Sequence, residues 1–151
     1  MDVYILDDYG QEREQIVKWL REDTKIRVEV FEDHQHLLER IKNSPSHLSI
    51  IRLGNNGIPG LKTAEMIKNE NPQTKIVFLA KDRDYALDAY EVGVDGYLLV
   101  PLEREKLEQA LLNIENLRER TQGNRLNQKD IQRKEMLENE KDKAYQEMGE
   151  K

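Results

Sequence analysis

Five short apolar runs alternate with amphipathic segments along the first 117 residues, and this alternation limits the possible folds more than any other feature. The runs are Val3–Leu6, Ile26–Phe31, Leu48–Leu53, Ile76–Ala80 and Tyr97–Val100. Strands that alternate strictly with helices form a parallel sheet with helices on both faces. The sequence therefore predicts one doubly wound α/β domain over residues 1–117, with most of its strands buried on both sides.

The residues between the runs predict where the helices end. Asn71 and Pro72 are expected to end the third helix, and Gly93 to end the fourth. Asp82 or Asp84 is expected to cap the start of the fourth helix, because a short acidic side chain accepts a hydrogen bond from the free N–H groups there.

Composition excludes several classes of protein. The chain carries 24 Lys and Arg against 30 Asp and Glu, a net charge of -6, which disfavours direct binding of nucleic acid by this chain alone. It has no cysteine, and therefore no disulfide and no thiolate metal site. Its first residues lack the basic region followed by an apolar stretch that is typical of a leader sequence, and no apolar run is long enough to cross a membrane. We expect a cytoplasmic protein.

The functional crevice of such a sheet lies beyond the carboxyl ends of its strands. The residues at these ends are Asp7 and Asp8, Arg52, Ala80, and Val100 with Pro101. Adjacent carboxylates are typical ligands of Mg²⁺, although Asp-Asp-Tyr-Gly is also common in loops and at helix caps. The third strand end is different, because the segment from residue 40 to residue 64 contains no acidic residue.

The strand ends and their neighbours resemble the receiver domain of two-component response regulators. The similar stretches are VYILDD, HLSIIRLGNNGIPG, KIVFLAK and DYALDAYEVGVDGYLLVPLE. The last is most similar to receivers attached to LytTR-type DNA-binding domains, and the resemblance covers residues 2 to about 117. It implies the CheY-like, flavodoxin-like (βα)5 fold, a doubly wound parallel sheet with strand order 2-1-3-4-5.

The resemblance also identifies departures from the family pattern. Receivers hold Mg²⁺ between the acidic pair and an acceptor Asp, with a hydroxyl residue after the fourth strand and a Lys before the proline. Asp7, Asp8, Tyr97 and Pro101 match this pattern. Arg52 replaces the acceptor, Ala80 the hydroxyl residue and Val100 the lysine. The resemblance thus implies a degenerate phosphorylation pocket and a pseudo-receiver without a bound metal.

Charge predicts a role for Arg52. Asp7, Asp8 and Arg52 sum to -1 with one cation already present, and a guanidinium forms short charge-assisted bonds to carboxylates. We expect Arg52 to bridge to Asp7 or Asp8. The alternative is that Arg52 extends into solvent while its aliphatic stem covers the strand end.

Other polar and small residues have simpler interpretations. His34, His36 and His47 lack a ligand pattern and are expected on the surface. Gly54, Gly57 and Gly60 lack the spacing of a phosphate-binding loop and predict a flexible loop. Tyr97 is either a core aromatic or, as in the family, a switch residue, but Ala80 cannot couple to it through a hydroxyl.

Residues 118–151 differ from the rest, with nine Lys or Arg, eight Asp or Glu and few large apolar residues. Strong helix formers with mixed charge predict a helical extension of the fifth helix. The apolar spacing does not sustain a heptad, so a coiled coil is weakly supported, and disorder is the alternative.

We therefore predict a non-enzymatic, phosphorylation-independent protein-interaction module in bacterial signal transduction or transcription regulation, without a cofactor. As in the family, a homodimer is expected through the fourth helix, fifth strand and fifth helix together with the C-terminal helix. The expected contact residues are Tyr85, Leu87, Tyr90, Leu107 and Leu111. The alternatives are an active phosphorelay receiver, the regulatory half of a DNA-binding response regulator whose output domain lies outside this chain, and a small-molecule sensor.

Overall fold

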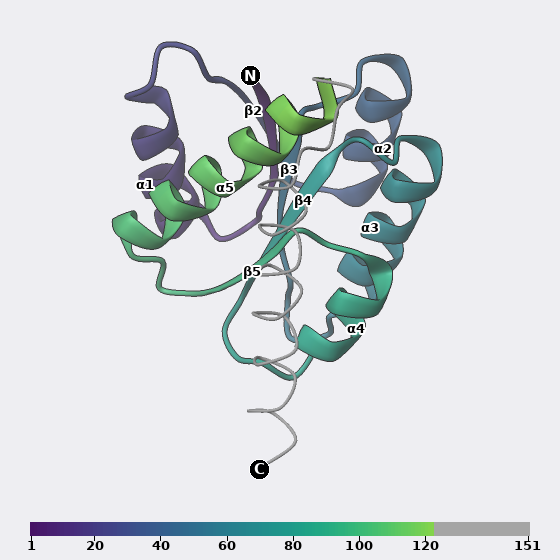
Figure 1. Ribbon diagram of the computed structural model, residues 1–151. Helices are drawn as coiled ribbons and strands as arrows, with labels where there is room; N and C mark the ends of the chain where they lie inside the picture. Colours follow the sequence, from purple (N-terminus) through teal and green to yellow (C-terminus); the bar gives the residue numbers. More distant parts are fainter. Residues whose placement is uncertain (123–151) are drawn as a thin grey trace. The chain divides into compact units, whose positions relative to one another are not determined.

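The structure, a computed structural model, describes residues 1–122, with side chains through residue 117. Five parallel strands form one sheet in the order β2-β1-β3-β4-β5 (Figure 1). The elements are β1 (Asp2–Leu6), α1 (Gly10–Arg21), β2 (Arg27–Phe31), α2 (His34–Asn43), β3 (Leu48–Arg52), α3 (Ile58–Glu70), β4 (Lys75–Ala80), α4 (Ala86–Val92), β5 (Gly96–Leu99) and α5 (Arg104–Gln122). The predicted fold class and strand order are confirmed.

Met1–Leu107 form one compact unit, and a second unit begins at Glu108. The predicted domain boundary after residue 117 stays a prediction. The predicted helical tail over residues 118–151 lies almost entirely outside the described residues, since only the backbone of residues 118–122 is described. No described helix is long and apolar enough to cross a membrane.

Helices cover the sheet on two sides, with α1 on one face and α2, α3 and α4 on the other (Figure 1). The three central strands β1, β3 and β4 are buried along nearly their whole length, as expected for strands covered on both faces. The edge strand β2 is partly exposed at every position, because it has a neighbour on one side only. The core between the sheet and α2, α3 and α4 includes Leu37, Ile51, Ile67 and Phe78.

The helix ends match two of three predictions. Asn71 is the C-terminal cap of α3, and Gly93 ends α4 with φ of 90°, a left-handed conformation that glycine adopts without strain. The predicted cap of α4 is wrong. Tyr85 precedes the helix without a side-chain cap, while the Asp82 carboxylate accepts a bond from Asp84 N–H at 3.0 Å, inside the preceding turn.

The predicted flexible loop from Gly54 to Gly60 is also shorter than expected. The α3 helix begins at Ile58, so that Gly60 is a buried helical residue. A Cβ atom at Gly60 would overlap the Leu53 side chain. This glycine therefore permits close packing of α3 on the end of β3.

All three histidines are predicted to lie on the surface, but only His36 is exposed. His34 is half-buried and its Nδ1 lies 2.6 Å from Thr63 Oγ1, a contact that joins α2 to α3. His47 is also half-buried, and its Nδ1 accepts a hydrogen bond of 2.8 Å from Asp2 N–H. These two rings join neighbouring elements, which their spacing in the sequence does not indicate.

Candidate functional site

Sheet topology brings the predicted site residues together at the carboxyl edge. Strand β3 lies between β1 and β4, with Leu6 paired to Ile51 and Arg52 paired to Leu79. Asp7 directly follows β1, and Arg52 is the last residue of β3. Their side chains therefore leave adjacent strands at the same edge.

Arg52 binds two carboxylates from this position. Its Nε lies 2.7 Å from Asp7 Oδ1, and its Nη2 lies 2.7 Å from Glu12 Oε2. The Asp7 side chain is 0% exposed and that of Arg52 is 11% exposed. The expected bridge to Asp7 is confirmed, and the alternative in which Arg52 extends into solvent is wrong. Asp8 is exposed and does not take part in this bridge.

Glu12 is a site residue that the sequence interpretation missed. It lies in the first turn of α1, the helix that follows the loop after β1. Its only signal in the sequence is a carboxylate one turn into that helix, where acidic residues are also common because they complement the helix dipole. We refer to Asp7, Glu12 and Arg52 together as the Arg52 cluster; its formal charge is -1.

The Arg52 cluster holds its guanidinium firmly in the charged form. Burial opposes the charge, but the bonds and attraction from Asp7 and Glu12 outweigh it and raise the pKa of Arg52 above its ordinary value. The Tyr9 ring centroid lies 5.4 Å from Arg52 Cζ, within the range of a cation–π contact. Arg52 is thus enclosed by two anions and an aromatic ring.

Asp7 is fixed through both its backbone and its side chain. Its Oδ1 also accepts a bond of 2.8 Å from Tyr9 N–H, and its carbonyl oxygen accepts a bond of 3.0 Å from Arg13 Nη1. Arg13 in turn pairs with Glu32 at 3.2 Å. Asp7 Oδ2 is buried, and no described residue donates a hydrogen bond to it.

The other predicted site residues lie at the ends of β4 and β5. Ala80 is buried, and its carbonyl oxygen accepts a bond of 2.9 Å from Val100 N–H, which precedes Pro101 across a cis peptide bond. Tyr97 OH donates a bond of 2.7 Å to the carbonyl oxygen of Asp82. Burial raises the pKa of Tyr97 to about 12. The Tyr97 ring also meets Phe78 edge-on at 6.5 Å, so the ring is packed rather than directed into solvent.

The structure changes the set of expected contact residues. Leu107 is 2% exposed and belongs to the interior. Tyr85 packs against the core, with its ring against Gly57. The assignment of Leu107 to a contact face is therefore wrong, because packing in the interior uses this side chain. The assignment of Tyr85 stays a prediction, since its side chain remains partly exposed. Leu87, Tyr90 and Leu111 retain exposed surface, and Leu99 on β5, which the sequence interpretation missed, is 41% exposed.

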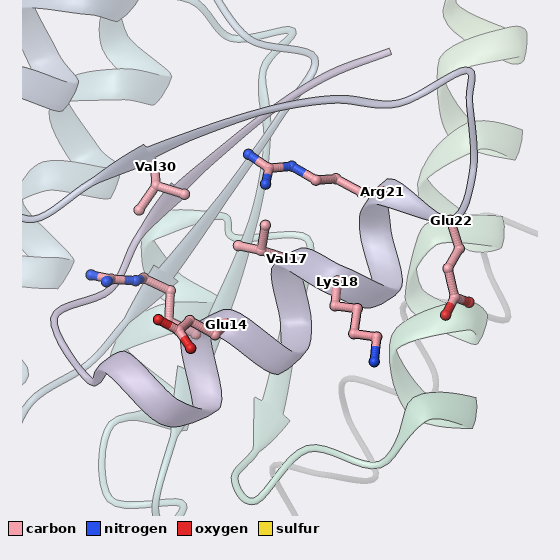
Figure 2. Close-up of a pocket in the computed structure, with 7 residues that line it drawn as sticks. Glu14, Val17, Lys18, Arg21, Glu22 and Val30 are labelled. Carbon is pink, nitrogen blue, oxygen red and sulfur yellow. The ribbon is translucent and has the colours of Figure 1, made fainter.

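A separate groove of about 520 Å³ lies between α1 and β2 (Figure 2). Val17 and Val30 supply its apolar surface. Basic side chains, including Lys18 and Arg21, and the acidic side chains of Glu14 and Glu22 surround it. The mixture of both charges favours no single class of ligand.

Comparison with known proteins identifies a family. The profile described as "Response regulator receiver domain" matches residues 3–112. The chain is 31% identical over 116 residues to the sensory transduction protein LytT of Bacillus anthracis, covering 74% of this chain and 46% of that protein. This chain thus spans about half the length of that curated relative.

Solved structures share the fold. The response regulatory domain of protein mrkE from Klebsiella pneumoniae has a TM-score of 0.72 at 17% identity, covering 80% of this chain and 99% of that one. The chemotaxis protein CheY4 of Vibrio cholerae has a TM-score of 0.66 at 19% identity, covering 75% of this chain and 97% of that one.

Proposed function

Because the chain belongs to the response regulator receiver family, a regulatory family of two-component signalling, we propose that it is a pseudo-receiver, a protein-interaction module that works without phosphorylation. One observation carries this proposal. At the end of β3, where the family resemblance places the phosphate-accepting carboxylate, stands Arg52, bound at 2.7 Å to both Asp7 and Glu12.

The nearby carboxylates are poor substitutes for the missing acceptor. No acid occurs in the segment from residue 40 to residue 64, so none is available on β3 or in the loop after it. The Asp7 and Glu12 carboxylates are both bound to the same guanidinium. Ala80 and Val100 also lack the hydroxyl and the ammonium group that the family pattern places beside the acceptor.

The donor set does not fit the Mg²⁺ ion that the family pattern implies. Mg²⁺ requires an octahedron of oxygen ligands close to ideal geometry. Asp7 Oδ1 already accepts bonds from Arg52 Nε and Tyr9 N–H, which leaves Oδ2 as the one free oxygen of this carboxylate. The described part of the chain contains no cluster of three or more His, Cys, Asp or Glu residues suited to a metal. The guanidinium also supplies one positive charge in place of the two that the ion would supply.

Phosphoryl transfer tests the proposal directly. Incubation with acetyl phosphate and Mg²⁺, followed by intact mass measurement, is expected to show no phosphoryl adduct. A receiver domain with a complete acceptor site, treated in parallel, shows that the reagent is active. A stoichiometric adduct on this chain would refute the pseudo-receiver proposal and favour an active phosphorelay receiver.

A second candidate is the regulatory half of a longer DNA-binding response regulator. The comparison with LytT favours it, because this chain covers only 46% of that relative. The net charge of -6 is consistent with DNA contact through another domain rather than through this chain. Sequencing the gene beyond codon 151 tests this candidate, because an encoded DNA-binding domain would support it and a stop codon would contradict it.

Small-molecule sensing has less support. The cavity beside Ala80 and Tyr85 has a volume of about 80 Å³. Ligand sites in proteins are usually of roughly 300 Å³ or more. The apolar character that Ala80 gives to this position therefore does not produce a pocket of ligand size.

The proposed module acts as a cytoplasmic homodimer through the surface of α4 and β5, where Tyr90 and Leu99 are 37% and 41% exposed. Both residues expose a large, mainly apolar side chain to solvent, and a dimer contact would bury it. The contribution expected from residues 118–151 lies outside the described residues and stays a prediction.

A further inference from the structure

Two loops at the carboxyl edge of the sheet are joined by side chains. The first connects β3 to α3, and the second connects β4 to α4. Lys81 Nζ in the second loop donates a bond of 2.8 Å to Asn55 Oδ1 in the first. The ring of Tyr85 lies against Gly57, so close that a Cβ atom at Gly57 would stand 2.6 Å from Tyr85 Cδ2.

The Tyr85–Gly57 contact depends on the size of residue 57 rather than on its backbone conformation. Gly57 has φ of -78° and ψ of -9°, a conformation that every L-amino acid adopts readily. Carbon atoms in ordinary contact lie about 3.5–4.0 Å apart, so an added methyl group would force the ring to move. A hydrogen atom at this position is what allows Tyr85 to pack there.

The position of Tyr85 sets the start of α4. Tyr85 is the N-terminal cap of this helix, and its carbonyl oxygen accepts a bond of 2.9 Å from Ala89 N–H. The same loop is tied to β5, because Tyr97 OH donates to the Asp82 carbonyl oxygen at 2.7 Å. The loop after β3, the start of α4 and β5 are therefore connected through consecutive contacts.

We propose that Tyr85 and Gly57 form a clamp that holds the start of α4 against the loop after β3 and keeps the surface of α4 and β5 in one conformation. This inference rests on the proposed function, since a receiver that works without phosphorylation needs its contact surface set by its own side chains. Ala80 has no hydroxyl with which to organise this loop. The clamp and the Lys81–Asn55 bond do so instead.

Two glycines of one loop provide a matched test. Gly57→Ala places a methyl group against the Tyr85 ring, whereas a Cβ atom at Gly54 meets nothing within 4 Å. Hydrogen exchange is measured by NMR for the amides of Ala86 and Ala89 in both variants. We expect Gly57→Ala to raise their exchange at least about tenfold relative to Gly54→Ala, because a displaced helix start opens more often.

The Tyr97 ring gives a second measurement on the same samples. Burial raises the pKa of Tyr97 to about 12 in the intact chain, and release of the loop in Gly57→Ala is expected to lower it toward the ordinary value near 10. Gly54→Ala is expected to leave it unchanged. Tyr85→Ala removes the ring itself, and adding Gly57→Ala to that variant is expected to have little further effect on exchange.

Equal exchange in Gly57→Ala and Gly54→Ala would overturn the clamp. The clamp is also refuted if Gly57→Ala raises amide exchange by the same factor in the presence and in the absence of the Tyr85 ring. If Gly57→Ala does not fold, comparison of Tyr85→Ala with the unmodified chain decides, and unchanged exchange at Ala89 overturns the clamp.

The acetyl phosphate experiment is independent of the glycine variants. An adduct on the unmodified chain refutes the proposed function whatever the glycine variants show, and loss of the glycine difference without an adduct refutes the clamp alone.

Discussion

Replacement of Arg52 by alanine is expected to lower the free energy of unfolding by about 3 kcal/mol, because it strands the buried Asp7 carboxylate without its cation. Breaking a buried ion pair from one side costs roughly 3 to 5 kcal/mol. The Asp7 and Arg52 side chains are 0% and 11% exposed, which places the pair in that class. The Glu12 side chain is 32% exposed, so the second bond is screened by water and adds about 0.5 kcal/mol.

The loss is expected at the lower end of this range, because water entering the space left by the guanidinium hydrates Asp7. Urea unfolding followed by circular dichroism measures the change in free energy, and an unchanged denaturant slope shows that both states stay comparable. Arg40→Ala is the matched control, since Arg40 pairs with Glu29 at 3.0 Å but both side chains are more than 40% exposed. That exposed pair is expected to contribute little.

Rescue identifies the stranded charge as the cause. Asp7→Asn added to Arg52→Ala removes the uncompensated carboxylate, so the double variant is expected to be more stable than Arg52→Ala alone. A loss in Arg52→Ala no greater than in Arg40→Ala would refute the reasoning, because it would mean that the guanidinium does not compensate Asp7.

Three further outcomes are expected. Lys68→Met should lower the free energy of unfolding, measured in urea, by about 2 kcal/mol. The Lys68 ammonium group donates partly buried bonds to the Thr74 carbonyl oxygen at 2.7 Å and to the Asp95 carboxylate at 2.8 Å, and the variant loses both. A change below the error of measurement would contradict this. Bonds from the backbone N–H and the ring of His36 lower the pKa of Asp33. The Asp33 carboxylate therefore contributes its full stability above the ordinary pKa of 3.8, and this contribution is lost as pH falls through the lowered pKa. Asp33→Ala should flatten the fall in stability below about pH 4, measured by urea unfolding. Tyr90→Glu should produce monomers in light scattering whereas Met66→Glu, at an exposed position of α3, should not, and a monomeric unmodified chain would sink the dimer proposal.

The sequence by itself determined the fold, because strand and helix periods are local properties. Apolar runs of four to six residues alternate with helical patterns, and each of the five strands lies within two residues of its run. It also placed Asp7 and Arg52 together, since the carboxyl ends of adjacent parallel strands meet at one edge. Residue type then predicted the ion pair between them.

Only the tertiary structure decided which other side chains complete the site. Glu12 in the first turn of α1 accepts a bond from Arg52 at the end of β3, and a residue's position within a helix does not specify how that helix is placed on the sheet. The family resemblance implies that Leu107 lies on a contact face, yet packing buries this side chain, and the ring of Tyr85 packs against Gly57. Which apolar side chains are buried depends on distances between elements that are far apart in the chain, so the contact surface could be determined only after those elements had been placed.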